Sequence, residues 1–308
     1  MIRTLAVATM AVGCLAGWNT SRAQAPQPDP QSSEYQATGE QARTYSFPGT
    51  GEAIPYHLYV PKGWKPGMHL PLVVVTHGAF QPAAAPFERP KTAPTLAAAA
   101  EKHGYIVAAV TGYHANATGV GGWNVPYEMI RAPRPPRPAG AEGAGPRASQ
   151  RPQRAPAAPE DLERAEMDVL YVTDLVAKEY DVDPQRIYLM GNSSGGGAVW
   201  TYGARYPERW AAISPSAAPL EDSSFPYEQL ENVPVLVVHG DADTVMSFEG
   251  SKAMVDHATM HGVDATWLPV PGGTHTDAWA EPAVLDRIFE FFDAHPKSEA
   301  AAHPSSGD

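Results

Sequence analysis

Cysteine and positive charge are both scarce in this sequence. The 308 residues include one cysteine, Cys14, in an amino-terminal segment that we expect to be removed. The remaining chain would then form no disulfide and offer no cysteine nucleophile. Lysine and arginine number 22 against 34 acidic residues, which gives a net charge of −12. This charge argues against nucleic acid as a partner, because phosphate binding needs a basic face.

Metal and phosphate motifs are missing as well. The sequence has no H-E-x-x-H pattern and no cysteine pair, and Asp241-Ala-Asp243 alone supplies too few oxygen ligands for calcium. The glycine-rich stretches at 49–52 and 119–122 fit no phosphate-binding pattern between a strand and a helix. We therefore expect no metal and no cofactor.

The amino terminus has the pattern of a secretory signal peptide. Arg3 precedes an apolar run over 5–18, and small residues follow at Ser21, Ala23 and Ala25. The run is shorter than the ~20 apolar residues that span a membrane, so no membrane span is expected. We predict a signal peptide over 1–23, cleavage after Ala23, and a secreted or periplasmic protein. Lipoprotein processing at Cys14 is an alternative.

The rest of the chain alternates between strand and helix patterns. A polar linker is predicted over 24–42, and a hairpin over 43–47 and 54–60. Short apolar runs predict buried strands at 70–78, 105–112, 186–191, 210–215, 234–240 and 266–273. Helical spacing occupies 93–104, 159–180, 249–262 and 282–295. We predict one α/β domain over 43–296, with a mostly parallel sheet, an antiparallel amino-terminal hairpin and helices on both faces.

Two segments interrupt or follow this domain. Residues 132–159 are rich in proline, alanine and arginine and nearly free of large apolar side chains. Such a segment cannot bury enough surface to offset its ordering entropy, so we interpret it as an insertion within the domain. The tail over 297–308 is predicted to be disordered.

The stretch Gly191-Asn-Ser-Ser-Gly195 lies between an apolar strand pattern and a helical one. A serine at a sharp strand-to-helix turn needs nearly side-chain-free neighbours two residues before and after it. Gly191 and Gly195 meet this need for Ser193, whereas centring on Ser194 would place Asn192 at the first small position. We predict Ser193 as a nucleophile, and close packing at Gly195, Gly196 and Gly197.

A serine nucleophile needs a histidine base and a carboxylate that orients it. In strand–helix folds these follow in the order serine, acid, histidine. Asp241 and Asp243 follow the run at 234–240, and His275 and Asp277 follow the next. Both loops should reach the carboxyl edge of the sheet. His77 and His239 each precede a glycine at a strand end and are expected to shape turns.

An oxyanion hole requires two backbone N–H groups. Ser194 is expected to supply one, and Ala79 or Phe80, after the strand at 70–78, the other. Four aromatic residues could line a substrate pocket or pack in the core: Tyr113, Trp123, Tyr127 and Trp279.

Over 43–295 the chain resembles the α/β-hydrolase superfamily. Residues 183–196 match the block D-P-x-R-I-Y-x-x-G-x-S-x-G-G, and His239-Gly240-x-x-Asp243 and Gly273-x-His275 match two later motifs. The stretch resembles secreted polyhydroxybutyrate depolymerases, feruloyl esterases and acetylxylan esterases, and is similar to prolyl-oligopeptidase-like catalytic domains. The resemblance implies Ser193 as nucleophile, Asp243 as acid and His275 as base. Asn192 departs from the histidine frequent at its position.

The sequence therefore predicts an exported serine hydrolase of carboxylic esters, with feruloyl, acetyl or polyester substrates. Peptide-bond cleavage in the same fold is one alternative, and a non-catalytic binding module is another. A monomer and a small homo-oligomer are both compatible with the sequence.

Overall fold

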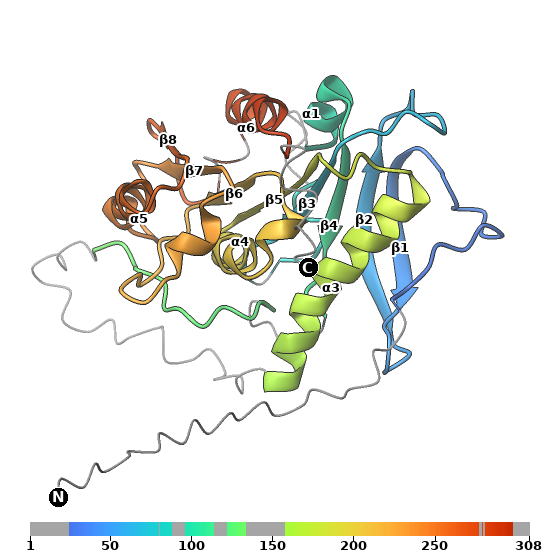
Figure 1. Cartoon of the computed structure of the whole chain (residues 1–308), viewed down its shortest axis with the longest axis horizontal. Coiled ribbons are helices and arrows are strands. Elements are labelled where there is room, and N and C mark those ends of the chain that lie inside the picture. Colours follow the sequence, from blue (N-terminus) through green and yellow to red (C-terminus); the bar gives the residue numbers. More distant parts are fainter. Residues whose placement is uncertain are drawn as a thin grey trace, which may run out of the picture.

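The computed structural model describes residues 25–79, 81–87, 96–113, 122–133, 158–276, 279 and 281–297. In this part of the chain the strands form one eight-stranded sheet in the order β1-β2-β4-β3-β5-β6-β7-β8 (Figure 1). Their bounds are β1 Gly39–Ser46, β2 Ala53–Val60, β3 Leu72–Thr76, β4 Ile106–Val110, β5 Ile187–Asn192, β6 Ile213–Ser216, β7 Val235–Gly240 and β8 Ala265–Val270. The two strands of the hairpin run antiparallel, and β3 to β8 pair in parallel.

Helices cover both faces of the sheet. The α-helices are α1 Leu96–His103, α3 Pro159–Glu179, α4 Ser194–Arg205, α5 Phe248–Met260 and α6 Pro282–Ala294; the 3-10 helices are η2 Pro207–Arg209 and η3 Tyr227–Leu230. Alternate residues of the central strands enter two separate cores. Val74 packs with residues of α3, α4 and α5, whereas Val73 and Val75 pack with those of α1 and α6. The predicted fold class is confirmed.

The sheet begins earlier than the sequence pattern indicates. Gly39 to Ala42 lie inside the range predicted as linker, yet they pair with Val60 to His57 as the first half of β1. This edge strand is polar and partly exposed, so it lacks the apolar alternation that would mark it.

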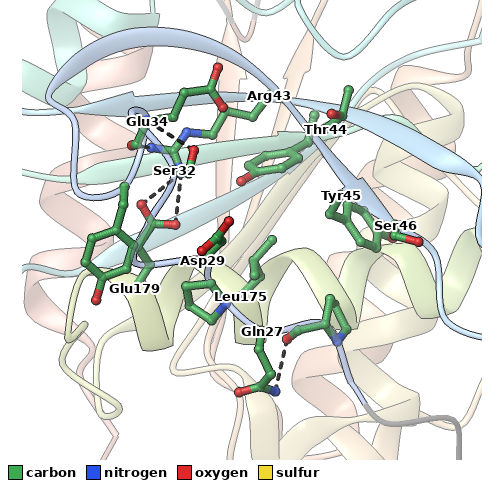
Figure 2. A pocket seen from close by; sticks show the side chains of 14 residues that line it. Gln27, Asp29, Ser32, Glu34, Arg43, Thr44, Tyr45, Ser46, Leu175 and Glu179 are labelled. Carbon is green, nitrogen blue, oxygen red and sulfur yellow. Dashed lines mark hydrogen bonds and ion pairs between the residues drawn. The ribbon is translucent and has the colours of Figure 1, made fainter.

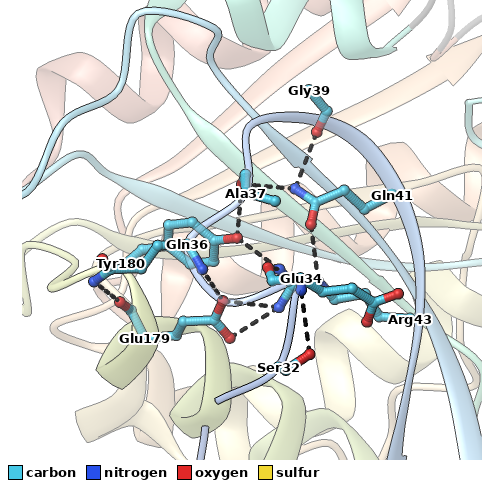
Figure 3. Close-up of polar contacts among 9 residues, drawn as sticks. All are labelled: Ser32, Glu34, Gln36, Ala37, Gly39, Gln41, Arg43, Glu179 and Tyr180. Carbon is cyan, nitrogen blue, oxygen red and sulfur yellow. Dashed lines mark hydrogen bonds and ion pairs between the residues drawn. The ribbon is translucent and has the colours of Figure 1, made fainter. Parts of the chain in front are cut away.

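The segment before β1 is bound to the body of the domain (Figure 3). The Gln36 N–H donates to Glu179 Oε1 at 2.7 Å, and the Tyr180 hydroxyl donates to the Ala37 carbonyl at 2.8 Å. Arg43 donates to both oxygens of Glu179 at 2.8 and 2.9 Å and also to the Glu34 carbonyl. Residues 34–37 are therefore fixed to the end of α3 and not loosely tethered.

Several sequence predictions lie outside the described residues: the signal peptide over 1–23 with Cys14, Phe80, residues 134–157 of the insertion, and the tail from 298. Among the helices that the structure describes, none is both long and apolar enough to cross a membrane.

Candidate functional site

Ser193 joins β5 to α4 in a strained backbone conformation. Its φ of 57° and ψ of −124° lie where residues with a β-carbon are rarely found. A β-carbon at Gly191 would lie 2.1 Å from Thr76 Oγ1, and one at Gly195 would lie 2.2 Å from the Thr76 carbonyl oxygen. The turn therefore needs both glycines, and it singles out Ser193 over Ser194.

The two glycines that follow differ from each other. A β-carbon at Gly196 would lie 2.6 Å from the Ala218 β-carbon, so α4 approaches the end of β6 closely there. At Gly197 the nearest atoms would be 3.5 Å away, an ordinary contact distance. The close packing expected of three glycines thus holds for Gly195 and Gly196 and is wrong for Gly197, which faces the less crowded side of the helix.

Ser193, His275 and Asp243 form a continuous chain of hydrogen bonds. Ser193 Oγ lies 2.9 Å from His275 Nε2, and His275 Nδ1 lies 2.8 Å from Asp243 Oδ2. The three residues come from the carboxyl ends of β5, β7 and β8, which the sheet brings to one edge. Ser193 is 8% exposed, and the Asp243 side chain is fully buried.

Asp243 is held as a carboxylate. Burial alone would raise the pKa of its carboxyl group, but hydrogen bonds from His239, His275 and the Met246 and Val245 N–H groups lower the pKa well below its usual range. The two N–H groups lie 3.0 and 2.7 Å from Oδ1. The group therefore remains negative wherever the histidine beside it changes protonation state.

The other acids do not share this position. Asp241 is exposed and accepts a hydrogen bond from the Gly272 N–H at 2.7 Å. That contact ties the loop after β7 to the loop after β8. Asp277 lies outside the described residues.

His239 makes a contact that its sequence position did not predict. Its Nε2 lies 3.0 Å from Asp243 Oδ2, and its Nδ1 lies 2.7 Å from Ser251 Oγ in α5. The imidazole is completely buried. The pattern His-Gly-x-x-Asp contains the signal, because a histidine that ends a strand can turn toward the acid four residues later. His77, by comparison, contacts the Gly78 and Thr111 carbonyls at 2.8 and 2.9 Å.

The backbones of Ser194 and of the loop after β3 both lie beside Ser193. Ser194 is the first residue of α4, so its N–H has no partner within the helix. Its hydroxyl is buried and has no hydrogen-bond partner among the described residues. Ala79 follows β3, and a β-carbon at the preceding Gly78 would lie 3.6 Å from the Ser193 β-carbon. The loop after β3 therefore passes beside Ser193.

Most of the aromatic residues considered for a substrate pocket are buried. Tyr113, Trp123 and Trp279 are only 3–4% exposed and belong to the two hydrophobic cores. Trp123 donates from Nε1 to the His77 carbonyl at 2.9 Å, and this hydrogen bond holds the start of the loop after β3. Tyr127 is half-buried and packs against Phe225. Burial favours the packing alternative for the first three.

Residues 122–133 run along the carboxyl edge of the sheet. The segment forms isolated antiparallel bridges, Met129 to Leu220 and Arg131 to Met246. The Ile130 N–H donates to the Pro219 carbonyl at 2.8 Å, and the Ser247 N–H donates to the Ile130 carbonyl at 3.0 Å. The loops after β6 and β7 are thus fixed to a common segment next to Asp243.

Asn192 adds a contact across the site. It is 3% exposed, and its Nδ2 lies 3.4 Å from the His275 carbonyl, which connects the turn at Ser193 to the histidine loop. Its Oδ1 is buried and has no partner in the described part of the chain.

Away from this edge, a cavity of about 300 Å³ lies between the amino-terminal segment, β1 and α3 (Figure 2). Asp29, Glu34, Arg43, Tyr45 and Glu179 are among the residues that line it, and none of the predicted site residues does. In the described ranges, no group of three or more His, Cys, Asp or Glu side chains could hold a metal ion.

Comparison with known proteins supports the architecture. No family model matches the chain. Over 143 residues it is 27% identical to acyl-protein thioesterase 1 of Gibberella zeae, a match that covers 43% of this chain and 58% of the thioesterase. The chain thus spans less than two thirds of the length of that relative.

Solved structures agree over a larger part of the chain. A thermostable esterase superposes with a TM-score of 0.54 and 22% identity, over 84% of this chain and 63% of that one. Staphylococcus aureus S-formylglutathione hydrolase superposes with a TM-score of 0.56 and 14% identity, over 82% of this chain and 96% of that one. A ferulic acid esterase superposes with a TM-score of 0.57 and 15% identity, over 82% of this chain and 98% of that one. The chain therefore has the α/β-hydrolase fold, as its sequence predicts.

Proposed function

We propose that this chain is an exported serine hydrolase that cleaves carboxylic esters through an acyl-enzyme intermediate. Ser193 is the nucleophile, His275 the general base and acid, and Asp243 the carboxylate that orients the histidine. The hydrogen-bonded chain from Ser193 Oγ through His275 to Asp243 Oδ2 carries the proposal. The strained backbone at Ser193 supports it, because such strain is concentrated at functional sites.

The protonation states follow from the contacts. An ionised Asp243 only accepts hydrogen bonds, so His275 carries its proton on Nδ1 and presents the Nε2 lone pair to the Ser193 hydroxyl. The low pKa of Asp243 keeps its charge in place when His275 becomes cationic.

In the acylation step, Ser193 Oγ attacks the ester carbonyl carbon while its proton moves to His275 Nε2. The carbonyl π electrons move to oxygen, and the resulting oxyanion is held by the N–H groups of Ser194 and of Ala79 or Phe80, at ~3 kcal/mol per donor. Collapse expels the alcohol, which takes the proton from His275. Water then attacks the acyl-enzyme by the same route, releasing the acid and restoring Ser193.

The compared proteins support the substrate class. Three of them are an acyl-protein thioesterase, a thermostable esterase and a ferulic acid esterase. All three names refer to enzymes that cleave the bond between an acyl group and an oxygen or sulfur atom. For this chain we propose feruloyl, acetyl or polyester esters as substrates.

A fluorophosphonate probe and a substrate panel test the mechanism. The parent protein should be labelled at Ser193 and should hydrolyse short nitrophenyl esters. Ser193→Ala should not be labelled and should lose at least about 10⁴-fold in kcat. Ser224→Ala, at an exposed serine, is the matched control and should behave like the parent. Ester hydrolysis by Ser193→Ala at the parental rate would refute the mechanism.

The same panel separates the alternatives. It should contain short acyl esters, feruloyl esters and proline-containing peptides. Faster turnover of the peptides would replace the ester proposal with a peptidase of prolyl-oligopeptidase-like type. Neither labelling nor turnover would indicate a binding module.

Export is a separate part of the proposal. The full chain, expressed in a bacterium with an outer membrane, should appear outside the cytoplasm with Gln24 as its first residue. A lipid-modified Cys14 at the amino terminus would favour the lipoprotein alternative. A cytoplasmic protein that keeps residues 1–23 would contradict export.

A further inference from the structure

The carboxylate of Asp243 contacts two histidines through one oxygen. His275 Nδ1 lies 2.8 Å from Oδ2, and His239 Nε2 lies 3.0 Å from the same atom. His239 is the penultimate residue of β7 and its side chain has no solvent exposure, whereas His275 follows β8 and its side chain is 15% exposed. The proposed mechanism uses His275 and leaves the contact of His239 unexplained.

The contacts of His239 define its tautomer. A neutral imidazole has one N–H, and a carboxylate accepts only, so the proton lies on Nε2 toward Asp243. Nδ1 then accepts from the Ser251 hydroxyl, 2.7 Å away. Ser251 is 1% exposed, and the ring of Phe248 packs edge-on against the imidazole. Ser251 thus fixes the tautomer of His239 by donating to one ring nitrogen, whereas Asp243 fixes the tautomer of His275 by accepting from one.

The result is an uninterrupted series of side-chain hydrogen bonds: Ser251, His239, Asp243, His275 and Ser193. On its other oxygen Asp243 accepts from the N–H groups of Val245 and Met246. His239 is the donor that attaches Oδ2 to the central sheet. It can therefore orient the carboxylate whether or not His275 is in place.

We propose that His239, with Ser251 behind it, is a positioning residue that holds the Asp243 carboxylate in the orientation His275 requires. The inference rests on the proposed function, in which Asp243 orients the base. A merely structural His239 would only fill space at the end of β7. A positioning His239 also determines how much of the Asp243 charge is directed at His275.

The kinetic test compares three variants. His239→Phe keeps a ring but removes the donor, and should lower kcat about tenfold with little change in KM, because a positioning defect acts in the transition state. His239→Gln places an amide N–H near the lost Nε2–H and should recover most of that loss. His257→Gln on α5, whose imidazole pairs with Asp222, is the matched control and should be unchanged.

The pH profile distinguishes positioning from packing. Without the His239 N–H, Oδ2 shares its charge with one histidine only, so the protonated form of His275 is stabilised more strongly. The acid-side midpoint of kcat/KM should then move to higher pH in His239→Phe, and to a smaller extent in Ser251→Ala. If His239→Phe does not fold, Ser251→Ala provides the same readout. The proposal would be overturned if His239→Phe and His239→Gln lost kcat equally. It would also be overturned if the acid-side midpoint of kcat/KM did not move.

A measurement without substrate separates this inference from the function itself. The His275 Nδ1–H should give a low-field proton resonance in the free protein, and this resonance should move further downfield in His239→Phe. That shift in a protein without ester hydrolysis would uphold the positioning contact while the proposed function failed. If the protein is active and His239→Phe changes neither the resonance nor kcat, the positioning role is refuted and the proposed function stands.

Discussion

Gly240 packs against Gly273 so closely that a β-carbon at Gly240 would lie 2.0 Å from the Gly273 carbonyl oxygen. The same carbonyl accepts a hydrogen bond from the Ala242 N–H at 3.1 Å. These contacts join the loop that holds Asp243 to the loop that holds His275. The distance between Asp243 and His275 thus depends on a position with no side chain.

Gly240→Ala is therefore expected to separate the two loops. A displacement of about 1 Å at the reacting groups should lower kcat on nitrophenyl esters about 100-fold. Gly197→Ala, within α4, is the matched control, because the nearest atoms to the added β-carbon would be 3.5 Å away, an ordinary contact distance. It should keep full activity and gain up to ~1 kcal/mol in the free energy of unfolding. Parental kcat in Gly240→Ala would contradict the role of this contact.

The two aspartates after β7 should respond differently to the same substitution. Asp243→Asn places an amide among four donors, at least one of which must face its NH₂ group, and should lower kcat by roughly 10³- to 10⁴-fold. Asp241→Asn keeps an acceptor for the Gly272 N–H and should change kcat less than about threefold. Initial rates on one ester at saturating concentration decide between them. A larger loss at Asp241 would reassign the acid.

Stability should depend on pH through Asp168. This carboxyl is fully buried in α3, which raises its pKa to about 6 against the opposing hydrogen bonds from Tyr45, Gly112 and Tyr113. An unfolded aspartate titrates near pH 4, so the folded state binds this proton more tightly. The stabilisation from this group is complete below about pH 4 and is lost as pH rises through about 6, by on the order of 3 kcal/mol.

Asp168→Asn removes that dependence. The difference in the free energy of unfolding, parent minus variant, should decline between about pH 4 and 6.5 and stay constant above. Urea unfolding at a series of pH values measures it. A difference that is flat or grows with pH over that interval would show that Asp168 is not protonated preferentially in the folded state.

The buried ion pair of Arg43 and Glu179 should matter for stability and not for catalysis. Both side chains are at most 5% exposed. Glu179→Gln leaves the guanidinium buried without its counter-ion and should cost ~3 kcal/mol in the free energy of unfolding. Because Glu179 also holds the Gln36 N–H, residues 25–37 should become sensitive to protease. Exposed Glu163→Gln in α3 is the control. A loss of kcat at unchanged stability would contradict this assignment.

Much of the fold could be predicted from the sequence because its central strands are continuous apolar runs. The runs at 70–78 and 234–240 contain β3 and β7, and the turn at Ser193 was marked by its two glycines. Such signals are local. The order of the sheet then brings Ser193, Asp243 and His275 to one edge without further information.

Other features depend on contacts that no local pattern encodes. Tyr113 and Trp123 were as compatible with a pocket as with the core, and only the path of the chain after β4 places them inside. The space available beside Gly197 depends on which face of α4 packs against β6. The contact of His239 depends on how sharply the chain turns after β7.

The bridges of residues 122–133 to Leu220 and Met246 have a consequence for how this protein can diversify. Ser193, Asp243 and His275 all follow α3 in the chain and are connected through β5 to β8. Residues 122–133 precede α3, yet they hold the loops after β6 and β7, so a change within them would also disturb the loop that contains Asp243. Recombination at β4 and α3 therefore cannot exchange residues 122–133 without also affecting the loops that they hold.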